Sequence, residues 1–108
     1  MKPTPKLINL NMNGKEYLRL LGGPPESVSM RSGEVMLNPG QTVGKHSTHN
    51  NEELLVILEG EGAFLLDADT QLEIKVGTVL YCPPETEHDV LNTGMAPLRY
   101  IYIVSKAN

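Results

Sequence analysis

The chain has 108 residues, of which 40% are hydrophobic and 20% charged, and its formal net charge is -4. This length fits one compact domain, and the composition is that of an ordinary globular protein rather than a disordered one. Lys and Arg form no cluster in the sequence, so we expect neither nucleic acid nor an anionic membrane surface as a partner.

Cys82 is the single cysteine, which excludes an internal disulfide and favours a reducing compartment. No apolar stretch has the length of a signal peptide or a membrane span. The sequence therefore predicts a cytoplasmic protein.

Glycine and proline recur at NG, GGPP, SG, NPG, EGEG and PP, and short segments rich in Val, Ile, Leu and Tyr lie between them. This pattern is typical of strands joined by turns, and no window shows helical spacing. Residues 1–13 are expected to form an extended N-terminal arm or an edge strand. The expected strands follow in chain order at residues 16–21, 28–37, 42–46, 53–58, 63–67, 71–76, 78–81, 88–92 and 98–104. A single all-β domain over residues 1–108 follows, as a sandwich, a jelly roll or a small barrel.

Two polar segments interrupt this pattern. The first, HSTHNNEE, begins at His46 and places two histidines and two glutamates within eight residues. The second, CPPETEHDVLN, begins at Cys82 and contains His88. Imidazole nitrogens and a carboxylate suit Mn, Fe, Ni, Cu or Zn, so the two segments together are a candidate metal site.

The two segments resemble the two motifs of the cupin family. Residues 40–60 resemble the first, which reads glycine, five residues, His-x-His, three or four residues, Glu, six residues, glycine. Residues 77–92 resemble the second, which reads glycine, five residues, Pro-x-Gly, two residues, His, three residues, Asn. The matching positions are Gly40, His46, Glu53, Gly60, Gly77, Pro83, His88 and Asn92. The chain departs from the pattern at Thr48, in place of the second histidine, and at Glu85, in place of the second motif's glycine.

The resemblance implies a double-stranded β-helix, a jelly-roll barrel in which the two motifs face each other and hold one divalent transition metal ion. It implies His46, Glu53 and His88 as ligands. On a regular strand residue 48 shares the face of His46 and residue 49 does not, but a bulge near residue 47 or 48 would turn His49 inward. We therefore expect His49 as a fourth ligand and Thr48 as a wall of the pocket.

Other candidates lie close to these motifs in the sequence. Glu52 is an alternative to Glu53 as the carboxylate ligand, and Glu52 and Tyr81 are candidates for the pocket. Arg31 and Arg99 are possible clamps for a carboxylate, although the sequence assigns neither of them to a face of a strand. No residue is identified as catalytic.

The segments LLVIL and LRYIYIVS are apolar on both strand faces, which indicates that both faces are buried. A second copy of the chain could cover the outer face, so we expect a homodimer. The resemblance implies a small-molecule ligand or substrate at the ion. It is compatible with a metal-dependent enzyme acting on a small polar molecule, of the dioxygenase, decarboxylase or isomerase type. We expect such an enzyme first, and the alternative is a non-catalytic binding or sensing module, with or without metal, because fold does not decide function.

Overall fold

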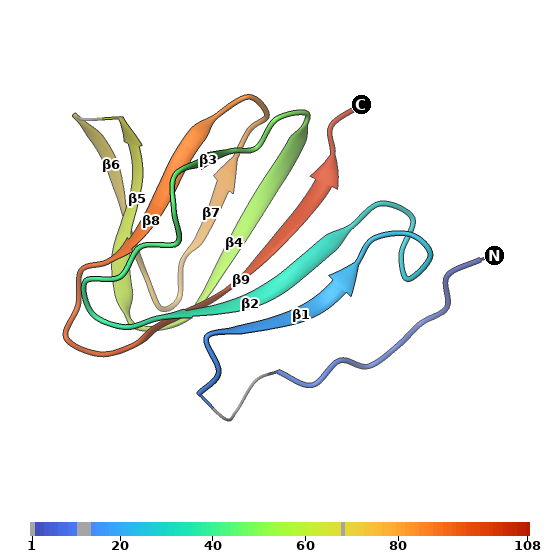
Figure 1. Cartoon of the computed structure of the whole chain (residues 1–108), viewed down its shortest axis with the longest axis horizontal. Coiled ribbons are helices and arrows are strands. Elements are labelled where there is room, and N and C mark those ends of the chain that lie inside the picture. The colour runs from blue at the N-terminus through green and yellow to red at the C-terminus, as the bar shows by residue number, and fades with distance from the viewer. Residues whose placement is uncertain (1, 11–13, 68) are drawn as a thin grey trace.

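The computed structural model describes residues 2–10, 14–67 and 69–108, and within these ranges it contains strands and no helix (Figure 1). The strands form two antiparallel sheets, with the order β1-β2-β9-β4-β7 in the larger and β3-β8-β5-β6 in the smaller. Their bounds are β1 Tyr17–Gly22, β2 Arg31–Leu37, β3 His46–Ser47, β4 Asn51–Glu59, β5 Glu61–Asp67, β6 Thr70–Lys75, β7 Val79–Cys82, β8 Glu87–Asn92 and β9 Leu98–Lys106. The all-β class and the double-stranded β-helix are confirmed.

Most expected strands lie within two residues of their observed bounds, and the exceptions have local causes. The strand expected at residues 42–46 is reduced to β3, because Gly44 has a φ of 109° and only an isolated bridge from Thr42 to Leu91 precedes it. The strand expected from residue 28 begins at Arg31, after a turn. Residues 2–10 form no strand and are mostly exposed, whereas residues 1 and 11–13 of the expected arm lie outside the described residues.

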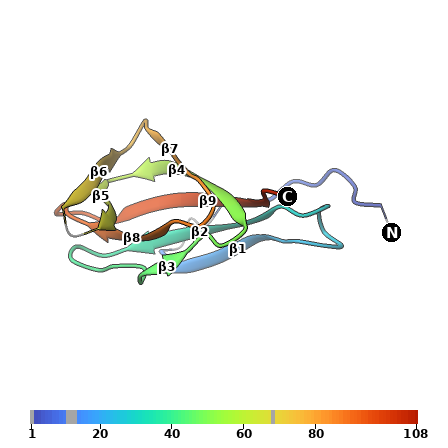
Figure 2. The ribbon, with the colours of Figure 1, turned by 90° about the horizontal axis from the view of Figure 1, so that it is seen from above.

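The core lies between the two sheets and follows strand alternation. In β4, Leu55 and Ile57 are buried while Leu54, Val56 and Leu58 are half-buried on the other face. A fully buried side chain of this size stabilises the folded state by about 1.5–3 kcal/mol. The buried apolar cluster consists of Val35, Leu37, Leu55, Ile57, Phe64, Ile74, Leu80, Cys82, Val90, Leu98 and Tyr100. Figures 1 and 2 show β5, β6 and β8 gathered at one end of the molecule, with the N-terminal segment extending from the other end.

Two residues of the expected motifs, Gly60 and Asn92, stabilise turns and are not candidate metal ligands. Gly60 has a φ of 85°, and a Cβ there would lie 2.3 Å from the carbonyl oxygen of Pro97, so only glycine fits. The buried Asn92 amide donates to the carbonyls of Leu37 and Ala96 at 2.9 Å each and accepts from the Gly94 amide at 2.8 Å. The motif asparagine therefore ties β8 to the turn before β9.

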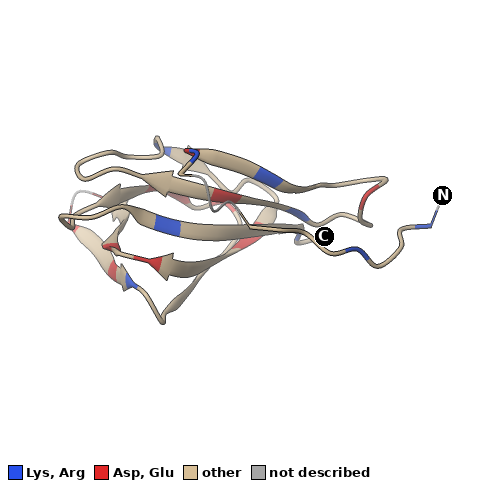
Figure 3. Ribbon diagram, turned by 90° about the horizontal axis from the view of Figure 1, so that it is seen from below, with Lys and Arg blue, Asp and Glu red and all other residues tan. Residues whose placement is uncertain are grey.

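Figure 3 shows the Lys and Arg residues of the described chain spread singly over several strands and the N-terminal segment. Within the same residues there is no helix long and apolar enough to cross a membrane.

Candidate metal centre

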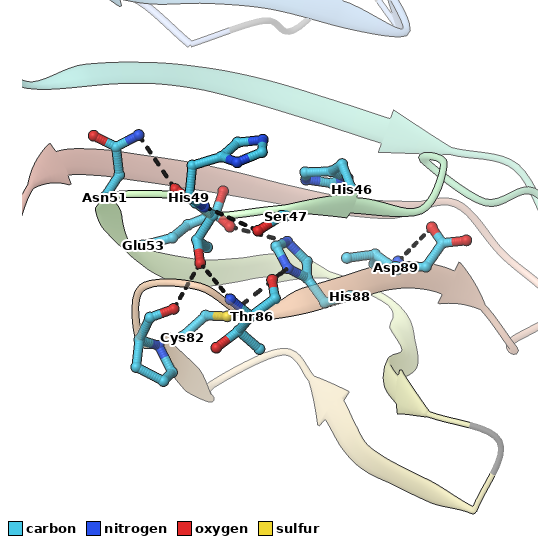
Figure 4. A network of polar contacts seen from close by, with 12 residues as sticks. His46, Ser47, His49, Asn51, Glu53, Cys82, Thr86, His88 and Asp89 are labelled. Carbon is cyan, nitrogen blue, oxygen red and sulfur yellow. Dashed lines mark hydrogen bonds and ion pairs between the residues drawn. The ribbon is translucent and has the colours of Figure 1, made fainter.

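The structure brings three of the predicted ligands together from three strands. His46 and His88 are direct register partners on β3 and β8 of the smaller sheet, and Glu53 faces them from β4 of the larger sheet. One ligand atom from each residue lies within 4.8 Å of the others (Figure 4). Side chains of both sheets therefore meet at one point.

Backbone carbonyls fix the tautomers of both imidazoles. Nδ1 of His46 lies 2.6 Å from the carbonyl oxygen of Gly44, and Nδ1 of His88 lies 3.0 Å from that of Thr86. Because a carbonyl only accepts hydrogen bonds, each Nδ1 carries a hydrogen, and in the neutral ring the lone pair is therefore on Nε2. Metal-ligating histidines are commonly oriented in this way.

His88 and Glu53 form the buried part of the group. Nε2 of His88 lies 3.2 Å from Oε1 of Glu53, and the two side chains are 1% and 11% exposed. Burial lowers the pKa of His88, but hydrogen bonds to Glu53 and to the Thr86 carbonyl outweigh it, so the pKa lies above its ordinary value. A lone pair facing a carboxylate requires a positive charge between them, which a proton on Nε2 or a metal ion supplies.

The surroundings hold the His88 ring in place. The Phe64 ring stacks on it with centroids 4.9 Å apart, and Sγ of Cys82 lies 3.8 Å from its Nδ1. Burial raises the pKa of the Cys82 thiol, and the nearby Glu53 charge raises it further. Cys82 is therefore a neutral buried neighbour of the site rather than a nucleophile.

The group fits a divalent transition ion. Two neutral imidazoles and one carboxylate are ligands that Mn, Fe, Ni, Cu and Zn accept, and three protein ligands leave positions open for other molecules.

Thr48 and His49, the two candidates for the second-histidine position, both lie outside this group. Thr48 is buried, and its hydroxyl donates to the Pro83 carbonyl at 2.7 Å and accepts from the Thr86 amide at 3.1 Å. His49 is exposed with a φ of 52°, in a turn that the Asn51 amide closes onto the Thr48 carbonyl. The backbone thus turns at His49 and not through a bulge before it, and the role of His49 as a ligand stays a prediction without geometric support.

The two other pocket candidates lie on the opposite face of the larger sheet. Strand alternation turns Glu52 away from the face of Glu53, and the β4–β7 register places Tyr81 opposite Leu54, also facing outward. The Tyr81 hydroxyl donates to Glu52 at 2.8 Å. This differs from the expectation. The direction of Glu52 follows from alternation with Glu53, whereas that of Tyr81 depends on the pairing of β7 with β4, which the sequence does not show.

A cavity of about 590 Å³ lies beside the three-residue group. Its wall is mainly apolar and aromatic, with polar side chains from several strands. The lining residues are Glu16, Tyr17, Arg31, Val35, Met36, Leu37, Gln41, Thr42, Val43, His46, Ser47, Thr48, His49, Asn51, Glu53, Leu55, His88, Val90, Tyr100, Tyr102 and Val104. Of these, Tyr17 was not anticipated, because it lies far in sequence from both motifs.

Comparisons with known proteins agree with this architecture. The chain is 33% identical over 76 residues to an uncharacterised protein of Methanocaldococcus jannaschii, a match covering 70% of this chain and 60% of that protein. It is 33% identical over 70 residues to a Thermotoga maritima protein named as an oxalate-binding protein, covering 65% of this chain and 57% of the relative. The chain thus spans only about 60% of the length of these relatives.

Among solved structures, a cupin-family protein of Methanocaldococcus jannaschii with a double-stranded β-helix superimposes with a TM-score of 0.78 at 18% identity. The superposition covers 95% of this chain and 92% of that structure. The family model described as the cupin domain matches residues 33–104, which include both motifs and all three converging side chains. The chain belongs to the cupin family.

Proposed function

We propose that this cupin binds one divalent transition metal ion through His46, Glu53 and His88, and that the ion binds a small carboxylate-containing molecule in the adjoining cavity. The observation that carries the proposal is the convergence of two carbonyl-oriented imidazoles and one carboxylate beside an open cavity.

Charge favours an anionic ligand. Two neutral imidazoles and one carboxylate leave a divalent ion with a net charge of about +1, which a carboxylate neutralises. The cavity volume of about 590 Å³ lies in the range of small-molecule sites. The similarity to a protein named for oxalate binding supports the same ligand class.

Catalysis is a second candidate, favoured by the position of His49. This side chain lines the cavity but does not belong to the three-residue group. It is therefore available to hold or move a proton at a bound molecule, as dioxygenase, decarboxylase or isomerase chemistry requires. The metal would supply Lewis-acid chemistry or a binding position for oxygen.

Elemental analysis and metal titration test the binding proposal. We expect near-stoichiometric binding of at least one of Mn, Fe, Ni, Cu and Zn, and a melting temperature that falls on chelation. His88→Ala should weaken metal affinity at least about 100-fold, because even residues that only orient ligands contribute about 10- to 100-fold. Glu87→Gln, at the exposed neighbouring position of β8, is the matched control and should leave the affinity unchanged.

A cobalt-substituted sample then separates the two candidates. A small carboxylate should change the cobalt absorption spectrum, and oxygen uptake or carbon dioxide release is measured on the same sample set. Turnover that is lost in His49→Ala supports the enzyme, whereas saturable binding without turnover supports a binding module. A protein that binds no divalent ion contradicts both.

The buried Cys82 is compatible with a reducing environment, and we retain the cytoplasm as the proposed location.

A further inference from the structure

Strand register places Arg31 on the same sheet face as the candidate metal centre. Arg31 pairs with Val104 of β9, and Val104 pairs with Glu53 of β4, so the three residues form one row across neighbouring strands. Directly paired residues point to the same face, and both Arg31 and Glu53 line the cavity. Two strand spacings separate their backbones by about 10 Å.

Arg31 is the only Lys or Arg among the described residues that line the cavity. No ion pair of Arg31 occurs within the described residues, in contrast to Arg99, whose guanidinium binds the buried carboxylate of Glu34. Glu34 is three residues from Arg31 on β2 and Arg99 is five residues from Val104 on β9, so strand alternation turns both away from the face of Arg31. Of the two arginines considered from the sequence, only Arg31 is therefore placed to bind a ligand in the cavity.

The acidic residue Glu16 also lines the cavity, but at the other end of β2. Its carbonyl accepts from the Met36 amide, five residues along the strand from Arg31, which corresponds to about 17 Å. Glu16 is too distant to neutralise Arg31.

Two tyrosines extend the donor surface beside Arg31. The hydroxyls of Tyr17 and Tyr102 lie 2.6 Å apart, and Tyr102 is a diagonal neighbour of Arg31 on the next strand. One hydroxyl hydrogen forms their mutual bond, so the other is free to donate to a ligand. The Arg31 charge lies close enough to oppose the rise in the pKa of Tyr102 that burial and the Tyr17 hydrogen bond cause.

Gly33 provides the space for this pair. A Cβ on Gly33 would lie 2.7 Å from the Tyr17 hydroxyl and 2.7 Å from Cε2 of Tyr102. The tyrosines thus pack directly on the backbone of β2, next to Arg31.

We infer that Arg31, Tyr17 and Tyr102 form a second anion subsite in the cavity, and that the ligand is a small dianion. One acidic group binds at the metal centre of the proposed function, and a second carboxylate or phosphate accepts hydrogen bonds from Arg31 and the free tyrosine hydroxyl. Guanidinium groups bind both kinds of oxyanion through paired hydrogen bonds. Oxalate, whose carboxylates are bonded directly to each other, spans the shortest distance of the diacids, so we expect longer diacids to reach both subsites better.

The inference rests on the proposed metal site, and calorimetry on the metal-loaded protein tests the two separately. The probes are oxalate, malonate, succinate and glutarate, with butyrate as the single-acid reference and phosphonopropionate as the phosphate-type analogue. We expect the best of the longer diacids to bind at least about tenfold more tightly than butyrate, a difference of about 1.4 kcal/mol, because Arg31 adds charge-assisted hydrogen bonds to the second acid group. Comparison of succinate with phosphonopropionate distinguishes a second carboxylate from a phosphate.

Arg31→Gln should bring the affinities for diacids and butyrate to about the same level and leave the metal content unchanged. Arg31→Lys should retain part of the preference, since the charge remains and the paired geometry is lost. Lys75→Gln, which removes one positive charge on β6 of the other sheet, is the matched control and should change nothing.

Three results would overturn the inference while leaving the metal site intact: equal binding of butyrate and all diacids, oxalate as the tightest ligand, or a diacid preference that survives Arg31→Gln. Absence of metal binding, or of any carboxylate binding to the loaded protein, would instead contradict the proposed function itself.

Discussion

The proton on Nε2 of His88 connects the chemistry of the metal centre to protein stability. The folded pKa of His88 lies above its ordinary value of 6.5, so the folded state holds this proton more tightly than the unfolded chain does. The stabilisation is fully present below about pH 6.5 and is lost as the pH rises through the folded pKa. A metal ion competes with this proton for the same lone pair, so metal binding strengthens as the pH rises.

We therefore predict opposite pH trends for the two states of the protein. As the pH rises above about 6.5, the melting temperature of the chelated protein should fall, while the gain in melting temperature on adding metal should grow. Thermal unfolding with and without chelator measures both. His88→Gln should remove the first trend, and a chelated protein that becomes more stable over this range would contradict the assignment of the proton.

Thr48 and His49 are adjacent in the chain, but their substitutions test different properties: protein stability for Thr48 and metal affinity for His49. Thr48→Val leaves the Pro83 carbonyl and the Thr86 amide without their buried partner, which should lower the free energy of unfolding by about 1–3 kcal/mol. His49→Ala should leave metal affinity within about threefold, because His49 is outside the three-residue group and its side chain makes no hydrogen bond to that group among the described residues, whereas residues that orient ligands contribute about 10- to 100-fold. Denaturant unfolding and metal titration measure the two effects. A loss of metal affinity of tenfold or more in His49→Ala would establish it as a fourth ligand.

At the scale of elements, the turn before β8 carries backbone strain that a substitution can remove. Glu85 is exposed, has a φ of 54°, and donates its amide to the His49 carbonyl at 2.7 Å. A left-handed backbone costs a residue other than glycine about 1–2 kcal/mol. Glycine avoids this cost but loses more conformational entropy on folding, so the net gain from introducing glycine is smaller. Glu85→Gly, which also restores the family motif, should raise the free energy of unfolding by about 0.5–1 kcal/mol.

Denaturant unfolding at constant metal occupancy measures this change. Glu87→Gly, at the first residue of β8 and paired with Ser47 of β3, should have the opposite sign, because glycine weakens a paired strand. Equal destabilisation by both substitutions would show that Glu85 makes a contact that outweighs its strain.

Most strand positions could be predicted from the sequence, because glycine, proline and the alternation of apolar and polar residues are local signals. The positions of β4, β5, β7, β8 and β9 follow from apolar runs bounded by turns, and the inward set Glu53, Leu55 and Ile57 follows from a period of two. The meeting of His46, Glu53 and His88 could be predicted only through the motif resemblance, since the residues are far apart in sequence.

Strand pairing explains what could not be predicted. Tyr81 faces outward because β7 pairs with β4 in a register that places it beside Leu54, and no local signal contains that register. Arg31 faces the cavity because β2 adjoins β9, which in turn adjoins β4. The left-handed backbone at His49 could not be predicted either, because the sequence there is a run of polar residues without a glycine.

For the whole molecule, the outer face of the larger sheet favours a homodimer. Two apolar rows cross it, Ile103–Leu54–Tyr81 and Ile101–Val56–Val79, on three adjacent strands. Val79 and Tyr81 are 59% and 56% exposed, and the other four side chains are half-buried. We propose that a second copy of the chain covers these rows, since contiguous apolar faces of this kind mark association sites.

Light scattering at micromolar concentration should give the mass of a dimer, and Val79→Lys should convert it to a monomer with its metal affinity retained. Leu72→Lys, at a similarly exposed apolar position on β6, is the control and should leave the dimer intact. A wild-type monomer, or a dimer that tolerates a charge at position 79, would contradict this interface.

The position of β9 in the larger sheet has a consequence for how the protein is made. This strand is the last of the described strands in chain order, yet it lies between β2 and β4 and joins the two parts of the sheet. During translation, β2 and β4 have no partner for these edges until residues 98–106 leave the ribosome, so the barrel closes late and depends on long-range pairing. Nascent chains that stop before β9 would expose two apolar strand edges at once, which makes them substrates for chaperones and proteases rather than partly active proteins.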